Sequence, residues 1–317
     1  MSIVERALKK AQAKKPKTEA DNEPQASAPP ASQPRPEHVA RESARTVLPG
    51  ASAEEPAVAR ETSAALRSSG GRVEIDVKDL RAQGRLAPEN LAHQTEEEFR
   101  RIKWPVLNTI TGREGAETAS NNVVLVTSAI PGEGKTFNAL NLALSMAREP
   151  DLSVLLVDGD VAQPALTASL GLSMKAGLTD LISDPGLDAP SVVYETSVPK
   201  LYVVPAGSRR DNSPELLASS RMESILADFS RRASPGVVIF DSPPILATNE
   251  AQVLSRYAGQ IVMVVLADAT EQRVVTEALS LIDRTKPVNA VLNRVEPSLV
   301  SRYYSHYYYG YGRGNNG

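Results

Sequence analysis

The chain has 317 residues and a formal net charge of −3, from 35 lysines and arginines against 38 aspartates and glutamates. This near-neutral balance does not favour a nucleic-acid partner, which usually selects a basic surface. The absence of cysteine excludes disulfides, thiolate metal sites and a cysteine nucleophile, and it fits a reducing compartment. The longest apolar run has seven residues, 261–267, far short of the roughly 18–20 that a membrane helix needs. We therefore expect a soluble, cytoplasmic protein.

Residues 1–15 have the pattern of a short amphipathic helix. Apolar side chains recur at helical spacing, at Ile3, Val4, Ala7, Leu8 and Ala11. The neighbouring lysines lie on the other faces of that helix. The pattern has two interpretations, a frayed chain end or a docking helix for a partner protein or an anionic lipid surface.

Residues 16–71 are expected to be a disordered linker rich in proline and alanine. Eight prolines fall in this region, and no aromatic residue precedes Phe99. Such a segment cannot bury enough apolar surface to offset the entropy lost on ordering. The composition changes at residue 72, where we place the start of a folded domain that continues to residue 296.

Within this domain, short β-branched apolar runs alternate with helix-like stretches. A short alternating element at residues 72–80 and a charged helical segment at 96–103, before Pro105, come first. The predicted strands are residues 123–127, 154–158, 201–205, 237–241, 261–267 and 288–293. The predicted helices are residues 136–148, 214–232, 250–257 and 270–285. Continuous apolar strands between helices predict an α/β fold of three layers with a mostly parallel central sheet.

A phosphate-binding loop follows the first strong strand. Residues 128–136 read SAIPGEGKT, in which Ala129 replaces the first glycine of the pattern G-x-x-x-x-G-K-[ST]. Gly132 and Gly134 allow backbone N–H groups to close around phosphate oxygens. We expect Lys135 to bind the β- and γ-phosphates of ATP and Thr136 to bind Mg²⁺. The full set of predicted nucleotide-binding residues is Gly132, Glu133, Gly134, Lys135, Thr136, Phe137 and Asn293.

Three aspartates end two neighbouring strands. Asp158 and Asp160 follow one buried run, and Asp241 ends another. Carboxylates at the carboxyl ends of parallel strands point into the crevice where open α/β sheets bind ligands. A single one of them could instead be a helix cap. Together with Thr136 the three are expected to hold Mg²⁺, directly or through water, and one of them is expected to accept a proton from an attacking hydroxyl.

Six of the nine tyrosines lie within nine residues of the C-terminal tail, 297–317. They are Tyr303, Tyr304, Tyr307, Tyr308, Tyr309 and Tyr311. The flanking glycines and the lack of large aliphatic residues indicate that these tyrosines do not form a core. The alternatives are an adhesive tail without assigned chemistry or a segment on which the enzyme acts.

The three motifs together resemble the Walker A, A′ and B set of bacterial tyrosine kinases, over roughly residues 95–317. Besides SAIPGEGKT, they read VLLVDGD and VVIFDSPP. The resemblance implies that Lys135, Asp158 and Asp160 are catalytic and that the enzyme phosphorylates its own tyrosine cluster. It also implies an interface helix carrying Glu97, Arg100 and Lys103. Two positions depart from the family pattern, since Ala162 and Lys103 stand where arginines are usual.

The opening MSIVERALKKA, the long linker and EEFRRIKWPVL resemble one branch of that family, the exosortase-associated tyrosine autokinases of exopolysaccharide biosynthesis. The resemblance implies several partners. These are further copies of the chain in a ring-like homo-oligomer, a separate membrane-embedded activator of the chain-length-determinant type, and a protein-tyrosine phosphatase. No nucleic-acid partner is expected. The activator would hold the cytoplasmic chain at the inner membrane.

Two other functions remain open on the sequence. A partition ATPase of the MinD/ParA kind shares the motif order, but that group carries a second lysine where this chain has Ile130. A nucleotide-binding regulator without transfer chemistry is the non-enzymatic alternative. Asn293 contacts either the adenine edge or only its own turn. The three histidines, His38, His93 and His306, indicate no metal site.

Overall fold

A computed structural model describes residues 66, 68–112 and 122–295 of the chain. The chain divides into two units, Met1–Ala53 and Glu54–Gly317, and every described residue belongs to the second. The helix predicted for residues 1–15, the linker up to residue 65 and the tyrosine tail lie outside the described residues.

Eight strands form one mixed sheet, in the order β1-β4-β5-β3-β6-β2-β7-β8. Among these strands of the described residues only β4 and β5 pair antiparallel, so the sheet is mostly parallel, as predicted. The strands are β1 (Arg72–Val73), β2 (Val123–Ser128), β3 (Ser153–Asp158), β4 (Tyr194–Thr196), β5 (Leu201–Val204), β6 (Gly236–Asp241), β7 (Gln260–Leu266) and β8 (Val288–Asn293). All six predicted strands are therefore confirmed.

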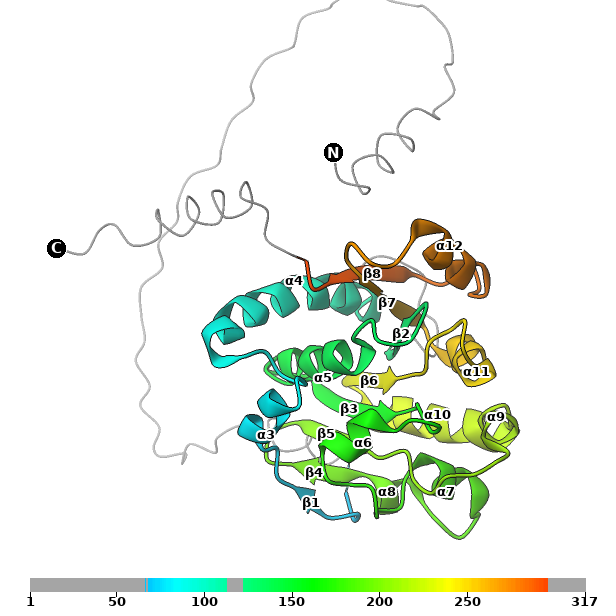
Figure 1. Cartoon of the computed structure of the whole chain (residues 1–317). Helices are drawn as coiled ribbons and strands as arrows, with labels where there is room; N and C mark the ends of the chain where they lie inside the picture. The colour runs from blue at the N-terminus through cyan, green and yellow to red at the C-terminus, as the bar shows by residue number, and fades with distance from the viewer. Residues whose placement is uncertain (1–65, 67, 113–121, 296–317) are drawn as a thin grey trace, which may run out of the picture. The chain divides into compact units, whose positions relative to one another are not determined.

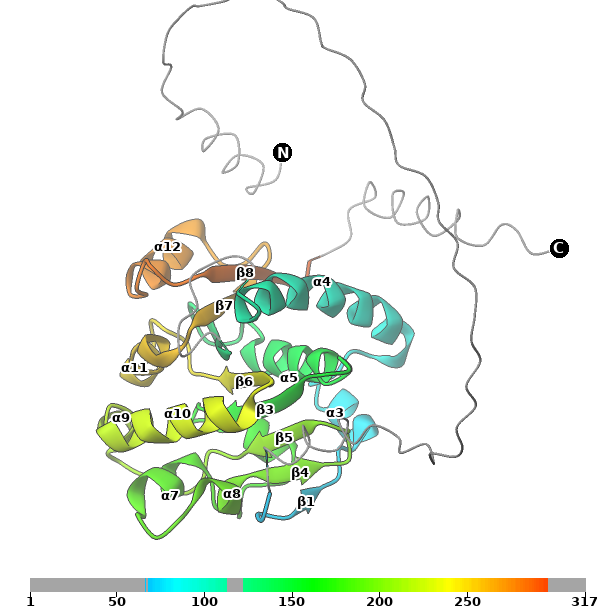
Figure 2. The same ribbon diagram turned by 180° about the vertical axis from the view of Figure 1, so that it is seen from behind.

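Helices cover both faces of this sheet (Figures 1 and 2). One face carries α3 (Val77–Ala82), α4 (Ala92–Ile110), α5 (Lys135–Met146) and α6 (Ala165–Ser169), with the 3₁₀ turn η2 (Glu89–Leu91) before α4. The other carries α7 (Leu178–Ser183), α8 (Ala189–Val192), α9 (Ser213–Leu217), α10 (Ser220–Ala233), α11 (Asn249–Tyr257) and α12 (Gln272–Ser280). Successive residues of the buried strands point to opposite faces, as in Leu125 and Val126, which belong to different core clusters.

The packed region begins upstream of the predicted boundary at residue 72. Leu66 is buried in the core on the α10 face, and Val73 is buried in the core on the α5 face. The hydroxyl of Ser68 donates to the carbonyl of Val193, 2.6 Å away. The segment therefore runs along the β4 side of the sheet, with apolar side chains in both layers.

Three helix predictions were wrong in extent. The helix predicted to end before Pro105 continues as α4 to Ile110, because Phe99 and Val106 on either side of the proline are both buried. The single helix expected over residues 214–232 is two helices, since the Ser219 side chain accepts from the Met222 N–H and starts α10 anew. The helix expected over 270–285 is the shorter α12. No helix in the described part of the chain is both long and apolar enough to span a membrane.

Candidate nucleotide and phosphoryl-transfer site

The phosphate loop connects β2 to α5 and approaches β8 closely. Gly132 and Gly134 have φ angles of 86° and 97°, a region that glycine adopts readily. A Cβ atom on Gly134 would lie 2.1 Å from the side-chain nitrogen of Asn293. Both the backbone conformation and the neighbouring side chain therefore require glycine at position 134.

The loop ends at the N-terminus of α5, where Lys135 is the first residue of the helix. The first N–H groups of a helix have no acceptor within it, and they carry partial positive charge, so this end suits phosphate. The Phe137 side chain packs instead against Phe99 of α4, with ring centroids 6.2 Å apart. Only the backbone of Phe137 is thus placed for the predicted nucleotide contact.

The Glu133 side chain holds the loop closed from within the protein. It is almost fully buried, and its Oε2 accepts from the Ile130 N–H at 2.8 Å. Its Oε1 accepts from the Thr270 hydroxyl at 2.5 Å and from the Leu266 N–H at 3.2 Å. The Glu133 carboxylate therefore joins the loop to the end of β7. Only the backbone of Glu133 remains for the predicted contact with a nucleotide.

Asn293, at the end of β8, provides a second connection to the loop. Its side-chain nitrogen donates to the Glu133 carbonyl at 2.8 Å, and its side-chain oxygen accepts from the Arg294 N–H. The residue thus lies at the loop, as predicted. The adenine contact itself stays a prediction.

Asp158 and Asp241 are brought together by the sheet. They are register partners on the adjacent parallel strands β3 and β6, and both are buried. Burial, and then the charge of the other aspartate, raises the pKa of Asp241. Burial also raises the pKa of Asp158, although hydrogen bonds from Thr167 lower it in part. Two carboxyl groups in this position resist ionising together without a cation.

The two aspartates differ in their partners. Asp158 Oδ2 accepts from both the backbone N–H and the hydroxyl of Thr167, at 2.8 and 2.7 Å. Neither carboxylate oxygen of Asp241 has a partner of hydrogen-bonding geometry among the described residues. The nearby Thr136 hydroxyl and the Lys135 charge each lower its pKa, without outweighing burial. A buried, unpaired carboxylate beside a phosphate loop fits a site for a cation.

Asp160 lies at the more open side of this group and is only half-buried. Its Oδ1 accepts from the Gln163 N–H at 3.0 Å, and burial raises its pKa. The Lys135 charge opposes that rise, so Lys135 and Asp160 belong to the same electrostatic site. The structure therefore gathers Lys135, Asp158, Asp160 and Asp241 at one edge of the sheet.

These carboxylates do not form a complete metal cage. In the part of the chain that the structure describes, no three acidic or histidine side chains converge closely enough to hold an ion. Mg²⁺ keeps several waters and binds through one or two carboxylates plus substrate phosphates. The donor set of Asp241, Thr136 and the neighbouring aspartates fits that habit.

The predicted interface helix is α4, and its three residues have different surroundings. Glu97 and Arg100 form an exposed ion pair at 2.5 Å. The Lys103 amine is buried, 2.5 Å from the Glu149 carboxylate and 3.1 Å from the Ser145 carbonyl. Lys103 therefore fixes α4 to the C-terminal end of α5 within one chain. The interface on α4 stays a prediction, and Glu97 and Arg100 are the more exposed of its three residues.

Sequence reasoning missed Thr167 and the structural role of Glu133. Thr167 is the main hydrogen-bond partner of Asp158, and it lies nine residues later in the chain, within α6. The proline at 164 was the available signal, since it precedes a short helix whose first turn returns to the end of β3. For Glu133 no local pattern indicates that its partners come from β7.

This fold and site define a phosphate-loop nucleotide-binding α/β protein, and similarity to known proteins specifies the class further. No protein-family model matches the chain. It is 32% identical over 182 residues to the tyrosine-protein kinase YwqD of Bacillus subtilis, covering 57% of this chain and 75% of that one. It is 31% identical over 189 residues to the putative tyrosine-protein kinase CapB of Staphylococcus aureus, covering 59% and 80%. Against the tyrosine-protein kinase wzc of Salmonella typhimurium, identity is 32% over 166 residues, covering 52% of this chain but only 22% of that one.

Solved structures agree with these relatives. The kinase domain of VpsO superposes with a TM-score of 0.55 at 28% identity, covering 66% of this chain and 100% of that domain. The chimerical protein CapA2B2 gives a TM-score of 0.56 at 25% identity, covering 74% and 97%. The chain belongs to the bacterial tyrosine-protein kinase family, whose members are enzymes of the protein-tyrosine kinase class.

Proposed function

We propose that this chain is an ATP-dependent protein-tyrosine autokinase that phosphorylates its C-terminal tyrosine cluster and thereby regulates exopolysaccharide polymerisation or export. The observation that carries the proposal is the buried pair Asp158 and Asp241 beside Lys135 and Thr136, at the end of a strand–loop–helix unit. The names of the relatives support the tyrosine as acceptor. The acceptor residues would be Tyr303, Tyr304, Tyr307, Tyr308, Tyr309 and Tyr311.

In this proposal each side chain has a separate task. The Lys135 amine pairs with the phosphoryl oxygens, and the N–H groups of the first α5 turn stabilise the negative charge spread over them. Asp160 is the carboxylate best placed to accept the tyrosine proton, since it is only half-buried and its pKa is raised. Asp158 is held by Thr167 and orients the group beside it.

Mg²⁺ bound with ATP would neutralise phosphate charge and would be held by the Thr136 hydroxyl and by Asp241, with Asp158 and Asp160 reached directly or through water. Without a cation, Asp241 remains a buried carboxyl group whose pKa burial raises. The protein contributes the position of these oxygens, and it buries the side chains of Asp158 and Asp241 almost completely.

Incubation of the full chain with ATP and Mg²⁺, followed by mass-spectrometric mapping of phosphotyrosine, tests this function. We expect phosphate on residues 303–311 in the native chain and none in Lys135→Met. Lys78→Met is a matched control, since Lys78 is exposed on α3 and outside the loop. Release of inorganic phosphate without phosphotyrosine would instead show an ATPase of the partition type. ATP binding with neither product would show a non-enzymatic regulator.

The partners follow from the same proposal. Further copies of the chain assemble in a ring-like oligomer through α4, whose exposed ion pair of Glu97 and Arg100 faces solvent in one chain. A separate membrane-embedded chain-length-determinant protein activates the kinase and holds it at the inner membrane, and a protein-tyrosine phosphatase resets it. The chimerical name of CapA2B2, a solved relative, is compatible with such a partner. Co-purification of the full chain with a candidate membrane protein, with and without residues 1–15, tests the contact.

We assign the chain to the exosortase-associated branch on its N-terminal and EEFRRIKWPVL segments alone. The second of these forms most of α4, whose buried residues are Phe99, Lys103 and Val106. Deletion of the exosortase-linked polysaccharide genes, with the phosphotyrosine level of this chain as readout, tests the assignment. An unchanged level in every such deletion would contradict it.

A further inference from the structure

A cavity of about 520 Å³ lies beyond the end of β5, at the same edge of the sheet as the phosphate loop. It is lined in part by Met174, Lys175, Asp180, Asp184, Leu187 and Arg210. None of these residues belongs to the phosphoryl-transfer site. The cavity therefore needs its own explanation.

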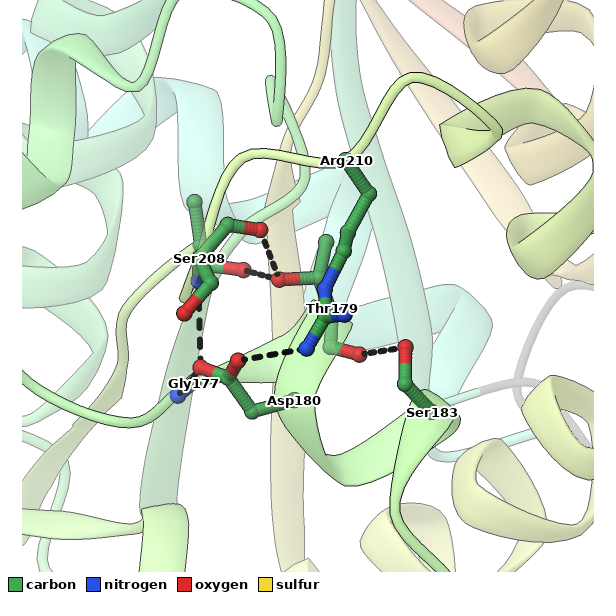
Figure 3. Close-up of polar contacts among 7 residues, drawn as sticks. Gly177, Thr179, Asp180, Ser183, Ser208 and Arg210 are labelled. Atoms are coloured by element: carbon green, nitrogen blue, oxygen red, sulfur yellow. Dashed lines mark hydrogen bonds and ion pairs between the residues drawn. The ribbon is translucent and has the colours of Figure 1, made fainter.

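Hydrogen bonds give this cavity a fixed floor (Figure 3). Asp180 Oδ2 accepts from the N–H groups of Gly177 and Ser208, at 3.1 and 3.0 Å, and its Oδ1 is 3.5 Å from an Arg210 nitrogen. The Thr179 hydroxyl lies 2.7 Å from the Ser208 carbonyl. A Cβ on Gly177 would be only 2.1 Å from the Pro205 carbonyl oxygen, so the two backbone segments are in close contact.

The same network reaches the catalytic edge. The Thr167 hydroxyl, which donates to Asp158, accepts from the Ala206 N–H at 2.9 Å. The Ala206 carbonyl in turn accepts from the Thr179 N–H at 3.0 Å. The floor of the cavity and Asp158 therefore share one chain of hydrogen bonds through Thr167.

The lining suits an unphosphorylated tyrosyl side chain. Met174 is 96% exposed at the rim and Leu187 is partly buried, so a thioether and an aliphatic chain are available to an aromatic ring. Asp184 offers a carboxylate to a phenol hydroxyl. Partial burial raises the pKa of Asp180, but hydrogen bonds from Ser208 and Gly177 outweigh it and lower that pKa, so this group is anionic. With Lys175 and Arg210 also in the lining, the two carboxylates leave the cavity without formal net charge, which suits a neutral phenol.

We propose that this cavity binds a tyrosine of the acceptor segment 303–311 of a second copy of the chain while another tyrosine of that segment reaches the phosphate loop. This inference rests on the proposed kinase function. β5 lies three strands from β2, or about 14 Å across the sheet. Four extended residues span about 13 Å. Tyr303 with Tyr307, Tyr304 with Tyr308, and Tyr307 with Tyr311 have that spacing.

The order of the strands favours a second copy as the source. β8, which directly precedes the tail, lies at one end of the sheet, and β5 lies near the other (Figure 1). α4 lies beside β8 and carries Trp104, which is 60% exposed. A head-to-tail contact through α4 joins different surfaces of the two copies, and we take the surface on the second copy to be its β5 end. Each tail would then start near its neighbour's cavity.

A transfer assay between two full-length chains tests the proposal. The donor carries serine at its six tail tyrosines, and the acceptor is Lys135→Met with its tail intact. We expect Met174→Asp in the donor to raise KM for the acceptor about tenfold, the scale of one lost apolar contact, with kcat changed less than about twofold. The same substitution in the acceptor should have no effect. Leu279→Asp, which also places a charge on an exposed apolar site, is the donor control.

An unchanged KM with the Met174→Asp donor would overturn the proposal, and so would an effect seen only in the acceptor. A labelled peptide of residues 302–313 supplies a second readout, its Kd for the serine-tail chain and for that chain with Met174→Asp. We expect weaker binding by the variant, and equal affinities of the two chains would overturn the proposal. This measurement does not depend on phosphoryl transfer. It therefore tests whether the cavity binds the tyrosine segment even if no phosphotyrosine forms and the proposed kinase function is wrong.

Discussion

Asp158 and Asp241 are register partners on neighbouring strands, yet they are satisfied in different ways. Thr167 supplies two hydrogen bonds to Asp158, while both oxygens of Asp241 are buried without a partner among the described residues. Hydrogen bonds within the fold fix Asp158, whereas Asp241 has both carboxylate oxygens available to bind a cation. This asymmetry leads to the first prediction.

Replacing Asp241 by asparagine should stabilise the protein without nucleotide and abolish phosphoryl transfer. Burial raises the pKa of Asp241, so the folded state binds a proton that the unfolded state releases between about pH 4 and pH 8. The free energy of unfolding therefore falls as pH rises through this window. Asp241→Asn removes the cost of ionising the buried group. We expect a gain of about 1–3 kcal/mol at pH 8 that shrinks towards pH 5.

Thermal unfolding at several pH values measures this effect. Asp228→Asn is the matched control, since Asp228 accepts hydrogen bonds from Arg231 and Arg232 on α10 and gains nothing from neutralisation. If Asp241→Asn and the native chain had equal free energies of unfolding at pH 8, Asp241 would not carry the cost of an ionised, buried carboxylate without a cation.

Thr167→Val should lower kcat while leaving the phosphate loop intact. The substitution removes the hydroxyl that donates to Asp158 at 2.7 Å and accepts from the Ala206 N–H at 2.9 Å. A buried N–H without an acceptor costs about 1–3 kcal/mol of stability. We expect kcat to fall about 10–100-fold, the scale of a misplaced acid–base group, with a smaller change in KM for ATP.

Thr167→Ser keeps the hydroxyl and should restore most of the activity. Steady-state kinetics on both variants, beside their melting temperatures, separates positioning from simple unfolding. A Thr167→Val enzyme with native kcat would show that Asp158 needs no second hydrogen bond.

Glu133→Gln should weaken nucleotide binding. Glutamine has one carbonyl oxygen and cannot accept from Ile130 on one side and from both Leu266 and Thr270 on the other. We expect Kd for a fluorescent ATP analogue to rise about tenfold, equivalent to one lost hydrogen bond of about 1.4 kcal/mol. Glu271→Gln, at an exposed ion pair with Arg273, is the control and should bind normally. If Glu133→Gln and Glu271→Gln bound the ATP analogue with the same affinity, Glu133 would not be needed to position the phosphate loop.

Phosphorylation of the tail should dissociate the oligomer. Each phosphotyrosine adds about −1.5 to −2 charges, so six of them add roughly −9 to −12 and repel the acidic site. Light scattering on a sizing column, before and after incubation with ATP and Mg²⁺, should show a fall in mass. Lys135→Met should keep its mass under the same conditions. A constant mass at full tail phosphorylation is the contrary result.

The sheet and the loop could be predicted because their signals are local. A buried parallel strand must be a continuous apolar run, and the loop chemistry needs Gly132, Gly134 and Lys135 in sequence. The region between residues 159 and 200 was not predicted, since α6, α7 and α8 have four to six residues and show no helical period. Short helices of that size depend on tertiary contacts.

The details of the site could not be predicted from the sequence because they also depend on tertiary contacts. Glu133 was expected to bind nucleotide, and its carboxylate accepts from the Leu266 N–H at the end of β7 and from the Thr270 hydroxyl, both more than 130 residues away. Lys103 was expected at an interface, and its partner within the chain is Glu149, three residues beyond the end of α5. Such partners are fixed only when the layers pack.

The Asn293 side chain donates to the Glu133 carbonyl, and Asn293 is the last residue of β8. The tyrosine cluster that we propose as the substrate begins at Tyr303, ten residues after this support of the phosphate loop. A truncation designed to remove only the acceptor tyrosines must keep Asn293 and Arg294. Cutting earlier would damage ATP binding and would be misread as the loss of a substrate.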